Sequence, residues 1–144
     1  MNAHEIKDFI RNYIDEVWNK GRIYSIGKYF APGYIHHDSS APEVQTLEDY
    51  IHLTKMLRSV FSGYHIEIDD LVALTGKGVI RWTMAGVHTG EFMGIPATEK
   101  QVRVTGVTFY CIPGNRIEEG WYTVDMLGLL HQLGALQFQG EGIV

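Results

Sequence analysis

The sequence predicts an α+β fold in which helices come first and hairpin-connected strands follow. Before residue 62, apolar residues recur at the helical spacing of three to four positions in three segments, and from Tyr64 to Val124 they mostly alternate with polar residues, which is the strand period. Turn-forming residues separate the strand-like runs. This order favours a mostly antiparallel sheet whose concave side is covered by the helices, with space for a cavity.

The first helix is predicted by one wide apolar face. That face consists of Ile6, Phe9, Ile10, Tyr13, Ile14, Val17 and Trp18. Asn2 with Glu5 predicts a capping box at its start, and Gly21 marks its end. A shorter second helix is expected over residues 23–30.

Residues 34–38 are expected to form a short strand, followed by a loop over 39–43. Thr46 with Asp49 predicts the start of a third helix, and Ser62-Gly63 its end.

The strands of the second half are expected from Tyr64 onward and over residues 79–88, 102–112 and 116–124. Thr75–Gly78 and Pro113–Asn115 are predicted hairpin turns. The link over residues 90–98 is expected to be ordered by its apolar side chains. A last helix is predicted over residues 126–133, and residues 137–144 are expected to form a loose tail.

Composition and charge limit the function classes. The 144 residues are 45% hydrophobic with a formal net charge of −5, and no repeat or linker divides them, so one domain over residues 1–144 is expected. The acidic balance argues against a nucleic-acid partner, and no apolar run approaches the ~20 residues of a membrane span. The chain starts without the features of a signal peptide, and Cys111 is its only cysteine, which predicts a cytoplasmic location.

Asp125 is the first candidate for acid–base chemistry. Strand alternation places it on the side of Trp121, with Tyr122 on the other side. Desolvation beside an apolar strand and helix would raise its pKa toward the range where an acid or base works. Asp is also a favoured N-cap, and Asp125 stands directly before the last helix. The residues alone leave both roles open.

Two histidine-containing segments also allow more than one interpretation. His88 and Arg81 fall on opposite faces of one strand unless a bulge at Gly86 shifts the register; His88 could orient a substrate carbonyl or simply bond a neighbouring backbone group. In the run His36-His37-Asp38, at most His36 and Asp38 share a face, which makes a poor zinc site, so no metal is expected.

Two long stretches resemble SnoaL-like proteins. Residues 86–98 match "G-x-H-x-G-x-x-x-G-x-P-x-T", and residues 117–134 match "I-x-E-x-W-x-x-x-D-x-x-G-L-L-x-Q-L-G". Residues 34–38 also look like the family's "Y-x-x-H-D" run. The resemblance implies the NTF2-like fold: a cone built from a strongly curved sheet and about three helices, usually dimeric through the sheet.

The family's namesakes are polyketide cyclases that close a ring by intramolecular aldol condensation, without metal or cofactor. In them an aspartate removes a proton beside a carbonyl in a hydrophobic pocket that orients the chain. In our alignment that aspartate falls at Tyr122 and an assisting histidine near Thr108. A tyrosine with an ordinary pKa near 10 cannot simply replace a carboxylate base, so the fold transfers further than the reaction.

The leading hypothesis is a cofactor-independent acid/base enzyme of the cyclase, isomerase or hydrolase type, acting on a small hydrophobic carbonyl compound. It predicts an inward, poorly solvated Asp125 within reach of His88 or Tyr122. The alternatives are a dimeric module that only binds a small molecule and a dimerising domain with a filled core. The catalytic candidates are Asp125, His88 and Tyr122. The substrate-binding candidates are His36, His37, Arg81, Trp82, Thr108, Tyr110 and Trp121.

Overall fold

The computed structural model describes residues 1–136; the predicted tail over 137–144 lies outside the described residues. The chain opens with α1 (Ala3–Tyr13), which continues without a break into a π-helical turn, η1 (Ile14–Asn19). The predicted capping box is present, because Asn2 accepts from the Glu5 N–H while the Glu5 side chain accepts from the Asn2 N–H. A short 3₁₀ helix, η2 (Ile23–Lys28), follows.

The described strands form one sheet in the order β1-β5-β4-β3-β2, in which β1 pairs parallel to β5 and the other neighbours are antiparallel. The strands are β1 (Phe30–Asp38), β2 (Phe61–Leu74), β3 (Lys77–His88), β4 (Gln101–Cys111) and β5 (Ile117–Val124). The predicted, mostly antiparallel sheet is therefore confirmed. The β2–β3 turn is tighter than the expected four residues, with only Thr75 and Gly76 between the strands.

The third predicted helix is α2 (Leu47–Val60), with the Thr46–Asp49 capping box in place. Its predicted end at Ser62-Gly63 is wrong, because β2 begins at Phe61. Gly63 has a φ of +65°, and the pairing with β3 shifts register between Ser62 and His65. These residues therefore form a bulge inside a strand, which bends it, rather than a helix stop.

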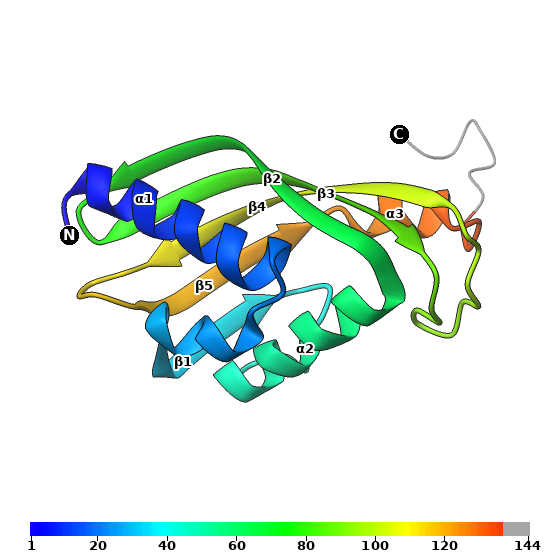
Figure 1. Cartoon of the computed structure of the whole chain (residues 1–144), viewed down its shortest axis with the longest axis horizontal. Helices are drawn as coiled ribbons and strands as arrows, with labels where there is room; N and C mark the ends of the chain where they lie inside the picture. The colour runs from blue at the N-terminus through cyan, green and yellow to red at the C-terminus, as the bar shows by residue number, and fades with distance from the viewer. Residues whose placement is uncertain (137–144) are drawn as a thin grey trace.

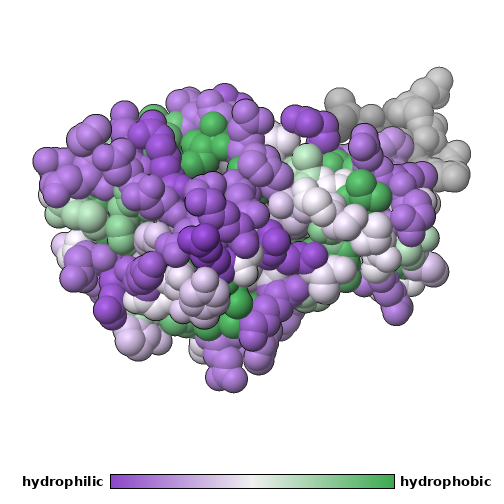
Figure 2. All heavy atoms as spheres, in the orientation of Figure 1, coloured by the Kyte–Doolittle hydropathy of each residue, from purple (hydrophilic) through white to green (hydrophobic). Residues whose placement is uncertain are grey.

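The helices α1 and α2 lie on the same side of the sheet, and β2 curves from the α1 end of the molecule to α2 (Figure 1). The last helix, α3 (Met126–Gln132), packs at the end of β4. Buried apolar side chains from these elements form one continuous core beneath the helices. The outer surface on this side is mostly hydrophilic with small hydrophobic patches (Figure 2). No helix within residues 1–136 is long and apolar enough to span a membrane.

Candidate functional site

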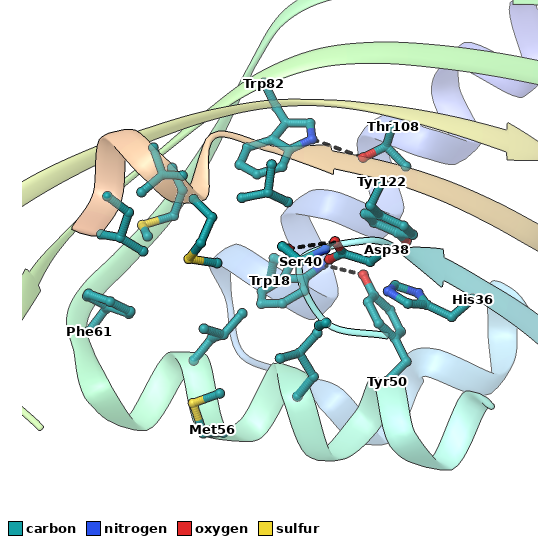
Figure 3. Close-up of a pocket in the computed structure, with 18 of the residues that line it drawn as sticks. Trp18, His36, Asp38, Ser40, Tyr50, Met56, Phe61, Trp82, Thr108 and Tyr122 are labelled. Atoms are coloured by element: carbon teal, nitrogen blue, oxygen red, sulfur yellow. Dashed lines mark hydrogen bonds between the residues drawn. The ribbon is translucent and has the colours of Figure 1, made fainter. Parts of the chain in front are cut away.

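The sheet and the helices surround a partly open cavity of about 190 Å³. Side chains from η1, α2, α3 and all five strands line it, as do those of the loop after β3. One end collects the polar groups His36, Asp38 and Tyr122, whereas Met56 and Phe61 lie at the other end (Figure 3). A cavity of 150 Å³ binds benzene, so this one holds about eight carbon atoms.

Strand pairing gathers the polar groups. His36 and Asp38 are two residues apart on β1 and therefore share a face. The parallel register sets Asp38 beside Tyr122 and His36 beside Gly120. All three side chains line the cavity, so the expectation that His36 and Tyr122 lie in a pocket agrees with the structure.

His36 is the most buried imidazole or carboxylate in the cavity wall, with 3% of its surface exposed. Its ring lies between those of Tyr50 and Tyr122, with ring centres 4.8 and 4.3 Å away. Nδ1 lies 2.8 Å from the Tyr34 hydroxyl, and Nε2 is buried without a hydrogen-bond partner. Burial lowers the pKa of His36 to about 4, against an opposing effect of the Asp38 carboxylate. The imidazole is therefore neutral at pH 7.

The carboxylate of Asp38 is held in a fixed position. Its Oδ1 accepts hydrogen bonds from the Ser40 N–H at 2.9 Å and the Ser40 hydroxyl at 2.6 Å. No hydrogen bond to Oδ2 is found among the described residues. The site thus pairs a neutral imidazole with a partly buried carboxylate at the polar end of an apolar cavity.

Tyrosine hydroxyls surround this pair. Tyr34 donates to the Tyr122 hydroxyl at 3.4 Å, and Tyr13 bonds Tyr50. Burial raises the pKa of Tyr122 well above its ordinary value, and that of Tyr34 in the same way. Both phenols are therefore protonated at neutral pH and act as hydrogen-bond donors rather than bases.

The upper wall of the cavity is the indole of Trp82, whose Nε1 donates to the Thr108 hydroxyl at 2.9 Å (Figure 3). This ring lies flat over Gly106: a Cβ there would stand 2.2 Å from an indole carbon. Tyr110 also lines the cavity. The expected pocket positions of Trp82, Thr108 and Tyr110 therefore agree with the structure.

Asp125 does not lie in this cavity. Its side chain is exposed and accepts a hydrogen bond from the Gly128 N–H at 2.9 Å, which caps α3. The expectation of an inward, poorly solvated carboxylate near His88 or Tyr122 is wrong. Alternation explains this placement, because β5 turns Tyr122 inward and Trp121 and Thr123 outward, and Asp125, directly after the strand, stays on the exposed side.

His88 is fully buried but does not line the cavity. Its Nδ1 accepts a hydrogen bond from the Thr98 N–H at 3.2 Å and lies 2.9 Å from the Thr98 hydroxyl. These contacts connect the two ends of the loop that follows β3. That loop sends Phe92 and Met93 to the cavity. A direct contact between His88 and a ligand in this cavity is therefore not supported, whereas the bond to a neighbouring backbone group is confirmed.

Three other candidates lie on the outer face of the sheet. Nε2 of His37 lies 2.6 Å from a carboxylate oxygen of Glu119, and the ring stacks on Trp121. Arg81 is exposed near Asp69. The expected pocket positions of His37, Arg81 and Trp121 are wrong. Side chains along a strand point alternately to its two faces, and these three residues occupy outward-facing positions.

Asp38 and Ser40 line the cavity although the sequence does not single them out as substrate-binding residues. The alternation of residues 34–38 predicts that His36 and Asp38 share a face, which by itself suggests only a weak metal site. A carboxylate and a histidine on one strand face next to an apolar wall is also the pattern of an acid–base pair.

A curved sheet covered by helices around an apolar cavity, with polar groups at one end, is the arrangement of NTF2-like proteins. The family model of SnoaL-like polyketide cyclases matches residues 8–133. The chain belongs to the SnoaL-like polyketide cyclase family.

Solved structures resemble it over nearly their whole length. TsrD from Streptomyces laurentii is 26% identical with a TM-score of 0.85, covering 94% of this chain and 99% of that one. A candidate polyketide cyclase from Acidithiobacillus ferrooxidans is 31% identical with a TM-score of 0.80, covering 91% and 95%. AclR from Streptomyces galilaeus, a candidate hydroxylase, shares the fold at 24% identity and a TM-score of 0.84, covering 94% and 99%. No curated protein sequence matches the chain significantly.

Proposed function

We propose that this protein is a cofactor-independent acid–base enzyme acting on a small hydrophobic carbonyl compound, by removing a proton from the carbon beside the carbonyl. The observation that carries the proposal is the buried Nε2 of His36, a polar atom without a protein partner in the wall of an apolar cavity. Buried polar atoms are nearly always paired, so an unpaired one on a residue that lines a cavity supports a ligand partner.

His36 is the proposed base and Tyr122 the proposed donor to the carbonyl oxygen. Their rings lie side by side, with centres 4.3 Å apart, so both reach one small ligand. The neutral imidazole offers a lone pair, and the phenol stays protonated because burial raises its pKa. Water exclusion and fixed geometry favour enolisation under these conditions.

Asp38 is proposed to stabilise positive charge that develops on His36 as the proton is transferred. Its carboxylate already opposes the lowering of the His36 pKa that burial causes. Asp38 thereby takes over part of the role that the resemblance gives to a carboxylate at position 122.

The cavity volume sets the size of the substrate. About eight carbon atoms fit in 190 Å³, which is less than the ~300 Å³ of the smallest common ligand pockets. Met56, Met84, Met93 and Met126 line it. Methionine side chains adapt to irregular apolar shapes, which suits a substrate with a hydrophobic body and one carbonyl.

The test is deuterium exchange at the carbon beside a carbonyl. Cyclohexanone, with seven non-hydrogen atoms, is incubated with the protein in D₂O and followed by proton NMR. We expect exchange above the buffer rate, and a loss of about a hundredfold or more in His36→Gln. His37→Gln is the matched control, because the neighbouring ring lies on the outer face.

The alternative is a non-catalytic binding module. It predicts that cyclohexanone quenches the fluorescence of Trp18 and Trp82, which line the cavity, without any exchange. Equal exchange in wild type and His36→Gln would contradict the proposed base.

The proposed assembly is a homodimer. Ile35, Val107, Phe109 and Trp121 are between 37% and 49% exposed on the outer face of β1, β4 and β5. Apolar side chains clustered on a sheet face are typical of a protein interface. We also propose that residues 1–144 form one domain. Cys111 is the only cysteine of the sequence, so no intrachain disulfide can form, which supports the proposal of a cytoplasmic location.

A further inference from the structure

The hydroxyl of Tyr34 lies between the proposed base, His36, and the proposed hydrogen-bond donor, Tyr122. It is 2.8 Å from Nδ1 of His36 on one side and donates to the Tyr122 hydroxyl at 3.4 Å on the other. Tyr34 itself is 2% exposed and does not line the cavity. Gly120 leaves room for it, because a Cβ at that position would stand 2.8 Å from the Tyr34 oxygen.

The direction of the Tyr34–Tyr122 hydrogen bond favours one of the two tautomers of His36 that its contact with Tyr34 allows. A phenol has one hydrogen, and that of Tyr34 is directed to Tyr122. Nδ1 of His36 must then be the protonated nitrogen and donate to the Tyr34 oxygen. In a neutral ring this leaves Nε2 unprotonated and without a hydrogen-bond partner among the described residues, so it is free to accept a proton.

We propose that Tyr34 is a positioning residue that fixes this tautomer and completes a neutral proton relay between His36 and Tyr122. The inference rests on the proposed function, because the relay serves the enolisation described above. It gives the site a connection between its base and its acid that does not pass through solvent.

The relay balances in both atoms and charge. The substrate C–H bond breaks, its proton bonds to Nε2 of His36, and its electron pair forms the C=C bond of the enol. Nδ1 passes its proton to the Tyr34 oxygen, Tyr34 passes its own to Tyr122, and Tyr122 protonates the carbonyl oxygen. His36 ends as the other neutral tautomer, and both phenols remain phenols. The reverse sequence restores the starting tautomer.

This relay suits the burial of the groups. Burial lowers the pKa of His36 to about 4 and raises that of Tyr122, so a lone imidazolium or phenolate is disfavoured in this cavity. A concerted transfer forms neither as a separate ion, and Asp38 then stabilises only the partial positive charge that His36 carries during the transfer. Low-dielectric surroundings that hinder a stepwise transfer therefore do not hinder the relay.

The test is the tautomer of His36, measured in the ligand-free protein by long-range proton–nitrogen NMR on ¹⁵N-histidine samples. We expect the Nδ1-protonated form in wild type. Tyr34→Phe removes the acceptor, and Tyr122→Phe frees the Tyr34 hydrogen to bond Nδ1, so both variants should change to the Nε2-protonated form. Tyr64→Phe, a cavity tyrosine that stacks on Trp18, should keep the wild-type tautomer.

Activity gives a second, separable readout. Tyr34→Phe should slow cyclohexanone exchange by about a hundredfold, the usual contribution of general acid–base catalysis, with little change in cyclohexanone affinity. An Nε2-protonated wild type, or full exchange in Tyr34→Phe, would overturn the relay. If the tautomer pattern holds but no variant or wild type exchanges cyclohexanone, the hydrogen-bond chain stands and the proposed function fails.

Discussion

The buried His36 makes stability depend on pH in a way that can be calculated. Its pKa is about 4 in the folded protein against an ordinary value of 6.5, so the unfolded chain binds this proton more readily. The corresponding stability is fully present above pH 6.5 and is lost as the pH falls toward 4. A difference of about 2.5 pKa units corresponds to about 3 kcal/mol at 1.36 kcal/mol per unit.

The assay is urea unfolding of wild type and His36→Gln at several pH values between 4 and 7.5, at one protein concentration. Other titrating groups contribute equally to both proteins, so the difference between the two curves isolates His36. We expect wild type to lose about 3 kcal/mol more than His36→Gln over this range. Parallel curves would show that folding does not lower the pKa of His36, and would refute the description of the site as desolvated.

Three further predictions concern other parts of the molecule. Asp125→Ala should lower stability by about 1 kcal/mol, the typical value of an N-cap, in urea unfolding, and should leave cyclohexanone exchange unchanged. Gly106→Ala should push the Trp82 indole into the cavity, destabilise the protein by about 1–3 kcal/mol and weaken cyclohexanone binding measured by fluorescence; unchanged affinity would argue against this wall. Phe109→Glu should give a monomer in sedimentation analysis without loss of folded structure, whereas a persistent dimer would place the interface elsewhere.

The fold was predictable because its signals are local. Both capping boxes, at Asn2 and Thr46, depend on side chains three residues apart, and the strand periods follow from alternation. The parallel pairing of β1 with β5 has no local signal, since it depends on how the chain returns across the sheet. The π-helical turn at Ile14–Asn19 is also hidden, because its apolar residues fit the ordinary helical spacing.

The site was only partly predictable, because alternation tells which residues share a face but not which face is inward. That ambiguity placed Trp121, His37 and Arg81 in the pocket, whereas the folded sheet turns them outward. Which face is inward also separates the two roles considered for Asp125, because the outward face makes it a helix cap rather than a cavity residue. Asp38 lies beside Tyr122 because β1 pairs with β5, a long-range contact that no short sequence motif predicts.

The most direct test of the central claim is the rate of cyclohexanone deuterium exchange at pH 5.5 and pH 7.5. A buried His36 base with a pKa of about 4 stays neutral at both values, so the two rates should agree within a factor of about two once His36→Gln has been subtracted. An imidazole with the ordinary pKa of about 6.5 would be about nine-tenths protonated at pH 5.5. A tenfold loss there, or no difference from His36→Gln at either pH, would contradict the account.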